Sequence, residues 1–297
     1  MIAVVGDIMV DRYIYGSSTR MSPECLTAPV IKEYSKETYV GGAGNTALNI
    51  KYLGGVAKLY CAVAINSVLL SMLDDEQLPF YSTINSNQDV IKTRIYSNGL
   101  YLARLDSDND IVTNESKLLT VLIDSCPSLL VLSDYSKGTI KDPKTIIDIA
   151  NSKNIKVLVD PKKDLNEYKG CYVLKPNAKE FIEWCGLEAP SDSTEAINML
   201  SKKLLLDAVE KLEIENLIVT VGDLGCILAT KNKEIKLFKA LPVTALDVTG
   251  AGDSFLAGLA VSLNEGKDIQ KAIEFATKVA GIAVTKKGTS YVNRNEI

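Results

Sequence analysis

One pattern repeats along this chain: a short run of β-branched and apolar residues ends in polar residues and is followed by a helical stretch. Such runs cover residues 2–5, 129–132, 156–159 and 172–174. Runs of this length are typical of buried parallel strands, and their alternation with helices is typical of a doubly wound sheet. The sequence therefore predicts an α/β fold in which helices cover both faces of a mostly parallel sheet. A ligand site is expected at the carboxyl ends of the strands.

The carboxyl-terminal third continues the pattern. We predict one helix over residues 192–212, a strand over residues 217–221, a hairpin that turns at Gly225 and a final helix that Asp268 caps. Neither a linker nor an internal repeat divides the sequence, so we expect residues 1–297 to form a single domain.

Three segments do not fit the main sheet. Residues 12–16 and 30–40 alternate apolar and polar side chains, and residues 91–105 have the pattern of a hairpin because Asn98-Gly99 favours a tight turn. We predict a small β-strand lid drawn from about residues 12–40 and 90–105. Because strands outside a main sheet leave open edges and apolar faces, we expect two chains to form a homodimer through this lid.

The overall composition limits the possible partners. A formal net charge of −4 gives no general attraction to nucleic acid or to an anionic membrane, and Asp124 and Pro127 interrupt the longest apolar stretch. The amino terminus lacks the basic segment of a secretory signal, so we expect a cytoplasmic protein with no nucleic-acid or membrane partner. None of the six cysteines belongs to a C-x-x-C pair, which argues against disulfides and structural zinc.

The chain contains no histidine. This excludes Ser-His-Asp and Cys-His catalysis as well as metal sites that use histidine, and it leaves carboxylates, Lys, Tyr or Cys to transfer a proton. A carboxylate base is the leading hypothesis for any catalytic chemistry here.

Residues 246–255 run from a turn-like segment into a helix and include Gly250, Ala251, Gly252 and Asp253. The glycines let the backbone approach a ligand closely. Since the first N–H groups of a helix lack intrahelical acceptors, this position favours an anion such as a transferring phosphoryl group. Asp253 would then take a proton from an acceptor hydroxyl. The alternative is an acidic helix cap beside two turn glycines.

Other polar residues at predicted strand ends and helix starts are candidate substrate ligands. Asp11 can accept hydrogen bonds from sugar hydroxyls, or it is a solvated turn acid. Asn45 follows Gly41 and Gly42 at a helix start, where its amide can face a substrate hydroxyl or belong to a helix cap.

Asn177 and Glu180 stand three residues apart at another helix start. In that position they can support a hydrated Mg²⁺ near nucleotide phosphates, or they can form a capping box that satisfies backbone amides. Arg94 and Arg104 alternate with apolar residues of the predicted hairpin, so each points either to the substrate or to water.

These motifs resemble those of the ribokinase/PfkB family of carbohydrate kinases over nearly the whole chain. Residues 41–45 (Gly-Gly-Ala-Gly-Asn) are similar to the amino-terminal signature of the family, and residues 247–253 (Asp-Val-Thr-Gly-Ala-Gly-Asp) to its more specific carboxyl-terminal signature. Within the family, the chain is most similar to the kinases of D-glycero-β-D-manno-heptose 7-phosphate. The segments that carry this finer match are residues 6–13, 20–24, 103–106 and 132–138.

The resemblance implies a ribokinase-like fold and an ATP-dependent kinase that uses Mg²⁺ and a monovalent cation such as K⁺. By this resemblance Asp253 is the catalytic base, and the anion hole is the backbone of Gly250, Ala251 and Gly252. The residues implied along the nucleotide and its phosphates are Asn177, Glu180, Thr220, Asp223, Gly225 and Asp247, of which Glu180 serves the metal through water. The residues implied at the sugar are Asp11, Gly41, Gly42, Asn45, Arg104, Asp134 and Lys137.

The expected reaction transfers the γ-phosphoryl group of ATP to the anomeric hydroxyl of heptose 7-phosphate and gives the 1,7-bisphosphate. Three basic residues, Arg94, Arg104 and Lys137, favour a substrate that already carries a phosphate. Some family members carry a fused nucleotidyltransferase, so we expect a separate one to act beside this chain. The alternatives are a PfkB kinase of another sugar, sugar phosphate or nucleoside, a dinucleotide-binding dehydrogenase, and a catalytically silent binding protein. The lack of G-x-G-x-x-G after the first strand disfavours the dehydrogenase, and Asp253 disfavours the silent protein.

Overall fold

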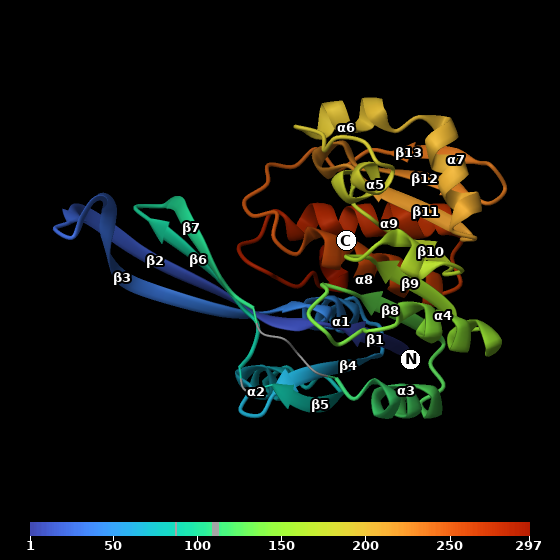
Figure 1. Ribbon diagram of the computed structural model, residues 1–297, viewed down its shortest axis with the longest axis horizontal. Helices are drawn as coiled ribbons and strands as arrows, with labels where there is room; N and C mark the ends of the chain where they lie inside the picture. The colour runs from blue at the N-terminus through green and yellow to red at the C-terminus, as the bar shows by residue number, and fades with distance from the viewer. Residues whose placement is uncertain (87, 109–112) are drawn as a thin grey trace.

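The computed structural model describes residues 1–86, 88–108 and 113–297, and within them the chain forms two sheets (Figure 1). The larger sheet has nine strands in the order β13-β12-β11-β10-β9-β8-β1-β4-β5. All neighbouring pairs from β11 to β5 are parallel, and β12 is antiparallel to both of its neighbours. The strands are β1 (Ile2–Gly6), β4 (Ala57–Ala64), β5 (Phe80–Ser86), β8 (Leu129–Ser133), β9 (Lys156–Asp160), β10 (Val173–Leu174), β11 (Asn216–Thr220), β12 (Cys226–Thr230) and β13 (Ile235–Phe238). The predicted mostly parallel sheet is confirmed.

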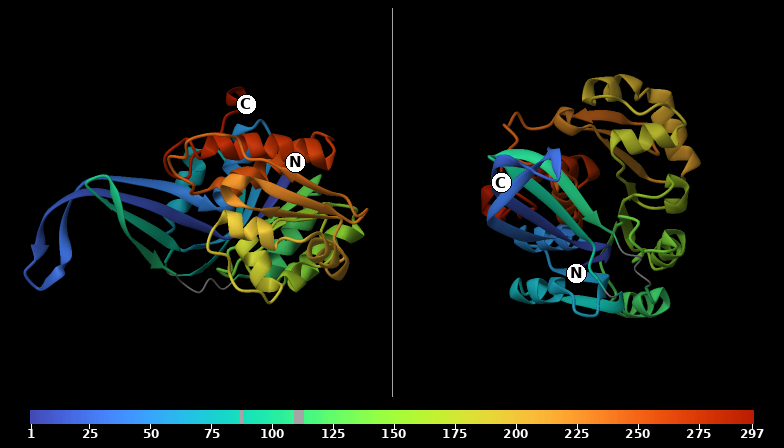
Figure 2. Two further views of the ribbon diagram at one scale, coloured as in Figure 1. Left: turned by 90° about the horizontal axis from the view of Figure 1, so that it is seen from above. Right: turned by 60° about the vertical axis from the view of Figure 1, so that its left-hand side comes forward.

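Helices cover both faces of this sheet (Figure 2). Because successive side chains of a strand point to opposite faces, Ile2 and Val4 of β1 pack into one core cluster, while Ala3 and Val5 pack into the other. The first cluster includes α1 (Ala43–Tyr52), α2 (Val68–Asp75), α8 (Ala251–Asn264) and α9 (Ile269–Ala283). The second includes α3 (Glu115–Asp124), α4 (Pro143–Ser152), α5 (Ala178–Trp184), α6 (Ser193–Met199) and α7 (Lys202–Lys211).

The smaller sheet is the lid, which projects from one side of the molecule (Figure 1). Its strand order is β3-β2-β6-β7, with β2 (Ile8–Ser22), β3 (Cys25–Gly42), β6 (Ile91–Ser97) and β7 (Leu100–Ser107). The predicted hairpin turn lies between β6 and β7, where Asn98 and Gly99 have φ angles of 52° and 80°. The lid strands fall in the predicted ranges of about 12–40 and 90–105 and run a few residues past them, since β2 begins at Ile8, β3 ends at Gly42 and β7 ends at Ser107.

The strands of the lid differ in their exposure. Tyrosine rings gather on β2 and β6, where the ring centroid of Tyr96 lies 6.3 Å from that of Tyr13 and 5.3 Å from that of Tyr15. Tyr13 is fully buried. By contrast, all residues of β7 are exposed, and Leu100 and Leu105 keep 75% and 61% of their surface open to solvent.

The predicted single helix over residues 192–212 is wrong. Two helices, α6 and α7, occupy this segment, and Leu200 between them has a non-helical ψ angle of 74°. The side chain of Ser201 accepts a hydrogen bond from the amide of Leu204 and so starts a new helix within the apolar pattern. Within the described ranges, no helix is long and apolar enough to cross a membrane.

Candidate active site

Asp253 lies in the first turn of α8 and is the centre of the candidate site. Asp253 is buried, with only 3% of the residue surface exposed. The carboxylate accepts hydrogen bonds from the Asn45 amide at 2.9 Å, the Tyr135 hydroxyl at 2.7 Å and the Thr46 hydroxyl at 3.4 Å. Burial raises the pKa of Asp253 to about 6, against which these donors favour the charged form. At neutral pH the Asp253 carboxylate is therefore mostly ionised, and its pKa lies close enough to neutral pH for it to act as a general base.

Gly250 shapes the start of α8. It has a left-handed φ angle of 79°, and a Cβ atom there would lie 2.7 Å from the Asn45 amide nitrogen that binds Asp253. Any side chain at this position would push the Asn45 amide away and break its hydrogen bond to the Asp253 carboxylate. The amide of Ala251 donates a long hydrogen bond of 3.3 Å to the carbonyl of Val248, while the next amides belong to the first helical turn and lack intrahelical acceptors. Amides of this kind at a helix start can bind an anion such as a phosphoryl group.

The loop that carries Tyr135 is held by Asp7 at the end of β1. Asp7 is fully buried and accepts hydrogen bonds from the backbone amides of Tyr135, Lys137 and Thr139 at 2.9, 3.0 and 2.8 Å. Sequence reasoning assigned no role to Asp7, Thr46 or Tyr135. The available signal was their position after predicted strands or at a predicted helix start, but that position does not reveal which side chains meet.

The predicted sugar residues near β2 and α1 lie together. Asp11 is buried and forms an ion pair of 2.5 Å with Arg94 of the lid. Gly41 leaves the space for this carboxylate, because a Cβ atom there would lie 2.2 Å from the Asp11 Oδ2 atom. Gly42 has a φ angle of 63° and approaches the Asp7 carbonyl, where a Cβ atom would lie at 2.4 Å. Both glycines are therefore required by the close approach of the end of β3 to β2 and to Asp7, which joins β1 to β2.

Different partners hold the two lid cations, Arg104 and Lys92, and Lys137 of the loop after β8. Arg104 is half exposed and forms an ion pair of 2.9 Å with Asp106. Lys137 pairs with Asp108 at 2.7 Å. Lys92 stands beside Asp11 in the β2–β6 register, and its Nζ atom lies 5.1 Å from the centroid of the Tyr135 ring.

Asp134 is engaged within the fold. It is buried, and it accepts hydrogen bonds from the Ser136 amide at 2.7 Å and the Tyr168 hydroxyl at 2.8 Å, one on each oxygen. Burial raises the pKa of this carboxyl. Asp134 therefore supports the loop after β8, and its predicted contact with the sugar stays a prediction.

A cavity of about 380 Å³ begins beside the start of α8. The predicted nucleotide residues Thr220, Asp223 and Gly225 line it, as do Ala251 and Gly252. Apolar side chains of α8, α9 and residues 240–248 complete its walls. Because one cavity joins an apolar chamber to the predicted anion site, it has the size and shape to hold a nucleoside with its phosphates at the helix start. Asp247 does not line this cavity; its carboxylate accepts from the amides of Thr249 and Gly288 at 2.9 and 3.1 Å and fixes the preceding loop.

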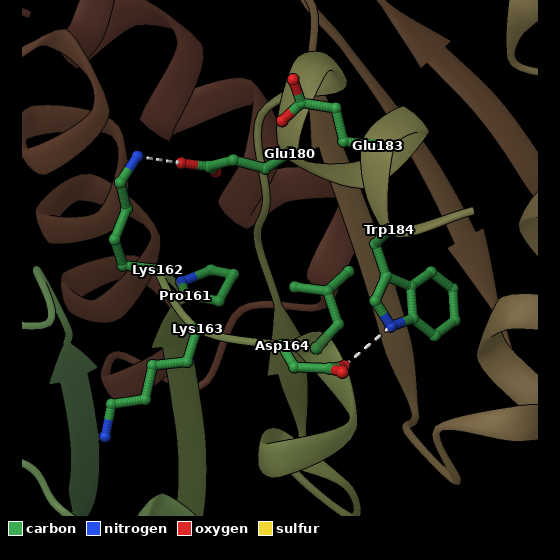
Figure 3. Close-up of a pocket in the computed structure, with 8 residues that line it drawn as sticks. Pro161, Lys162, Lys163, Asp164, Glu180, Glu183 and Trp184 are labelled. Atoms are coloured by element: carbon green, nitrogen blue, oxygen red, sulfur yellow. Dashed lines mark hydrogen bonds and ion pairs between the residues drawn. The ribbon is translucent and has the colours of Figure 1, made fainter. Parts of the chain in front are cut away.

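Asn177 and Glu180 form the capping box that was one of the two predicted arrangements. The Asn177 side chain accepts from the Glu180 amide at 2.8 Å, and the Glu180 carboxylate accepts from the Asn177 amide at 3.1 Å. Glu180 also binds Lys162 at 2.8 Å, beside an open hollow of about 390 Å³ that Trp184 borders (Figure 3). Within the described part of the chain, no three His, Cys, Asp or Glu residues are grouped to hold a metal ion.

Comparison with known proteins supports one family. The model of the pfkB family carbohydrate kinases matches residues 1–296. Similar curated proteins include the bifunctional protein HldE of Shewanella sediminis, 36% identical over 304 residues, and that of Haemophilus influenzae, 34% identical over 304 residues. Each match covers 100% of this chain but 62% of the relative, so the chain spans less than two thirds of the length of these proteins.

Solved structures confirm the ribokinase-like fold. Phosphofructokinase-2 from Escherichia coli, in complex with potassium, superposes with a TM-score of 0.82 at 18% identity, covering 100% of this chain and 96% of that one. Ribokinase from Thermotoga maritima gives a TM-score of 0.78 at 22% identity, covering 100% and 97%. At the level of the family, the prediction of a carbohydrate kinase is confirmed, and the dehydrogenase alternative has no support.

Proposed function

Because the chain belongs to the pfkB family of carbohydrate kinases, we propose that it transfers the γ-phosphoryl group of ATP to a sugar hydroxyl. The observation that carries this proposal is the buried carboxylate of Asp253 in the first turn of α8, where the preceding residues Ala251 and Gly252 line a nucleotide-sized cavity. Asp253 takes the proton of the acceptor hydroxyl as the sugar oxygen attacks the γ-phosphorus. The bond between that phosphorus and the β–γ bridging oxygen breaks, and its electron pair leaves with ADP. Amides at the start of α8 stabilise the charge on the phosphoryl oxygens.

We further propose that the acceptor is D-glycero-β-D-manno-heptose 7-phosphate and that its anomeric hydroxyl is phosphorylated. The finer resemblance of residues 6–13, 20–24, 103–106 and 132–138 to kinases of this sugar phosphate motivates the choice. Two of these segments, residues 6–13 and 132–138, contribute Asp7, Asp11 and the Tyr135 loop to the candidate site.

The environment of Lys92 favours a substrate that carries a phosphate group. Burial lowers the pKa of its ammonium, which reflects an environment that disfavours a lone charge. Unlike Arg104 and Lys137, it has no carboxylate at ion-pair distance among the described residues. A phosphate dianion would supply the missing partner through a charge-assisted hydrogen bond. We therefore assign Lys92, rather than the exposed Arg104, as the main ligand of the distal phosphate, with Lys137 beside it.

Mg²⁺ would supply charge neutralisation between the β- and γ-phosphates of ATP. Glu180 fits a role through water, since its carboxylate is already held by the Asn177 amide and by Lys162 and has few free lone pairs for direct ligation. Most metal ligands would then be nucleotide oxygens and water. A monovalent cation such as K⁺ is a further proposed activator.

A panel of acceptors with ADP production as readout tests the proposal. We expect heptose 7-phosphate to give a higher kcat/KM than fructose 6-phosphate and ribose. Lys92→Met should raise KM for the phosphosugar by roughly 10- to 100-fold, as expected for the loss of a charged contact, with little change in KM for ATP. Lys231→Met, a change at an exposed lysine paired with Glu215, is the matched control and should behave like the wild type. If ribose were the best acceptor, the phosphosugar proposal would fail and the kinase proposal would survive.

A further inference from the structure

A second charged pair lies beside the candidate anion site. Lys175 directly follows β10 and Asp160 ends β9, and since these strands are parallel neighbours the two side chains meet at the same end of the sheet. The Lys175 Nζ atom lies 2.9 Å from the Asp160 Oδ2 atom. Only 3% of the Lys175 side chain and 19% of the Asp160 side chain remain exposed.

The position of this pair relative to α8 can be measured at Gly252. A Cβ atom on Gly252 would lie 3.7 Å from the Lys175 Nζ atom and 3.8 Å from the Asp160 Oδ2 atom. Gly252 also lines the nucleotide-sized cavity. The ammonium therefore lies next to Gly252 in the first turn of α8, beside the amides that lack intrahelical acceptors.

Resting on the proposed kinase function, we propose that Lys175 binds the transferring phosphoryl group and that Asp160 positions it. An ammonium beside the helix start adds a full positive charge where the phosphoryl oxygens carry negative charge in the transition state. Lys175 makes and breaks no covalent bond in this step, and the acceptor proton still goes to Asp253. Asp160 holds the flexible lysine near Gly252.

The pH dependence of kcat tests whether the Lys175–Asp160 pair acts on the base. The Tyr135 hydroxyl donates a hydrogen bond to the base, and among the charged groups near it Asp160 raises and Lys175 lowers its pKa. Lys175→Met should therefore move the acid limb of the kcat profile to higher pH, whereas Asp160→Asn should move it to lower pH. The double variant replaces the pair with neutral groups, so its acid limb should lie near that of the wild type.

The kcat of the double variant then separates the effect of the ion pair on the pKa of Asp253 from its effect on binding of the phosphoryl group. We expect the double variant to keep its fold and its KM for the sugar within about threefold, and to lose kcat by roughly 10²-fold because the ammonium is missing from the transition state. Lys231→Met is again the control. If the double variant kept near-wild-type kcat, the inference would be overturned. The inference would also be overturned if the acid limbs of Lys175→Met and Asp160→Asn did not shift, or if both shifted equally. A wild-type protein inactive on every acceptor would instead overturn the proposed function itself.

Discussion

Replacing Tyr135 with phenylalanine removes one hydrogen bond from the proposed base and nothing else from the chemistry. The hydroxyl donates to the Asp253 Oδ1 atom at 2.7 Å. Burial and the neighbouring carboxylates raise the pKa of Tyr135 well above its usual range, so this donor stays protonated at every pH of interest. The Thr46 hydroxyl reaches the same oxygen at the longer distance of 3.4 Å and compensates only in part.

The size of the effect follows from the strength of a hydrogen bond to a charged group, about 1.5–3 kcal/mol, and from about 1.4 kcal/mol per pKa unit. Losing the bond should raise the pKa of Asp253 by roughly one to two units from its value of about 6. At pH 7 the ionised fraction then falls from about nine tenths to between about one half and one tenth, so kcat falls about 2- to 10-fold. Because the base acts in its ionised form, the loss should disappear near pH 9.

The measurement is kcat between about pH 5 and pH 9 at saturating ATP and sugar. Tyr34→Phe, at an exposed tyrosine of the lid, is the matched control and should leave the profile unchanged. An acid limb that stays in place in the Tyr135 variant would show that the hydroxyl does not tune the base. A loss of equal size at every pH would mean that Tyr135 acts through positioning alone.

Three more predictions concern the base, the metal and the assembly. Asp253→Asn should fold normally and lose kcat by roughly 10² to 10⁴-fold, and near-wild-type turnover would refute its role as base. Activity should require Mg²⁺ or Mn²⁺ and resist zinc chelators, because nucleotide oxygens and water supply most ligands; stoichiometric zinc in the purified protein would contradict this. Two chains should pair through the lid and bury Leu100 and Leu105, whereas a monomer in light scattering at micromolar concentration would count against the dimer.

The sequence by itself determined those features that depend on short stretches of chain. The β-branched runs, their polar ends and the Asn98-Gly99 turn predicted the strand type, the doubly wound sheet and the lid hairpin. Gly250 and Asp253 predicted a helix start with an acid in its first turn, since left-handed glycines and first-turn acids act over a few residues. The prediction of a single helix over residues 192–212 was wrong because the apolar periodicity continues through Ser201, whose side chain caps the start of a new helix.

Only the tertiary structure decided which of the candidate side chains meet. Asn45 and Tyr135 reach Asp253 from 208 and 118 residues away, and Lys175 meets Asp160 because β9 and β10 are neighbours in the sheet. The same holds for the cations of the lid, where register places Lys92 beside Asp11 and leaves Arg104 half exposed. Contacts of this kind depend on strand order, register and burial, and these are properties of the packed chain that no short pattern of residues contains.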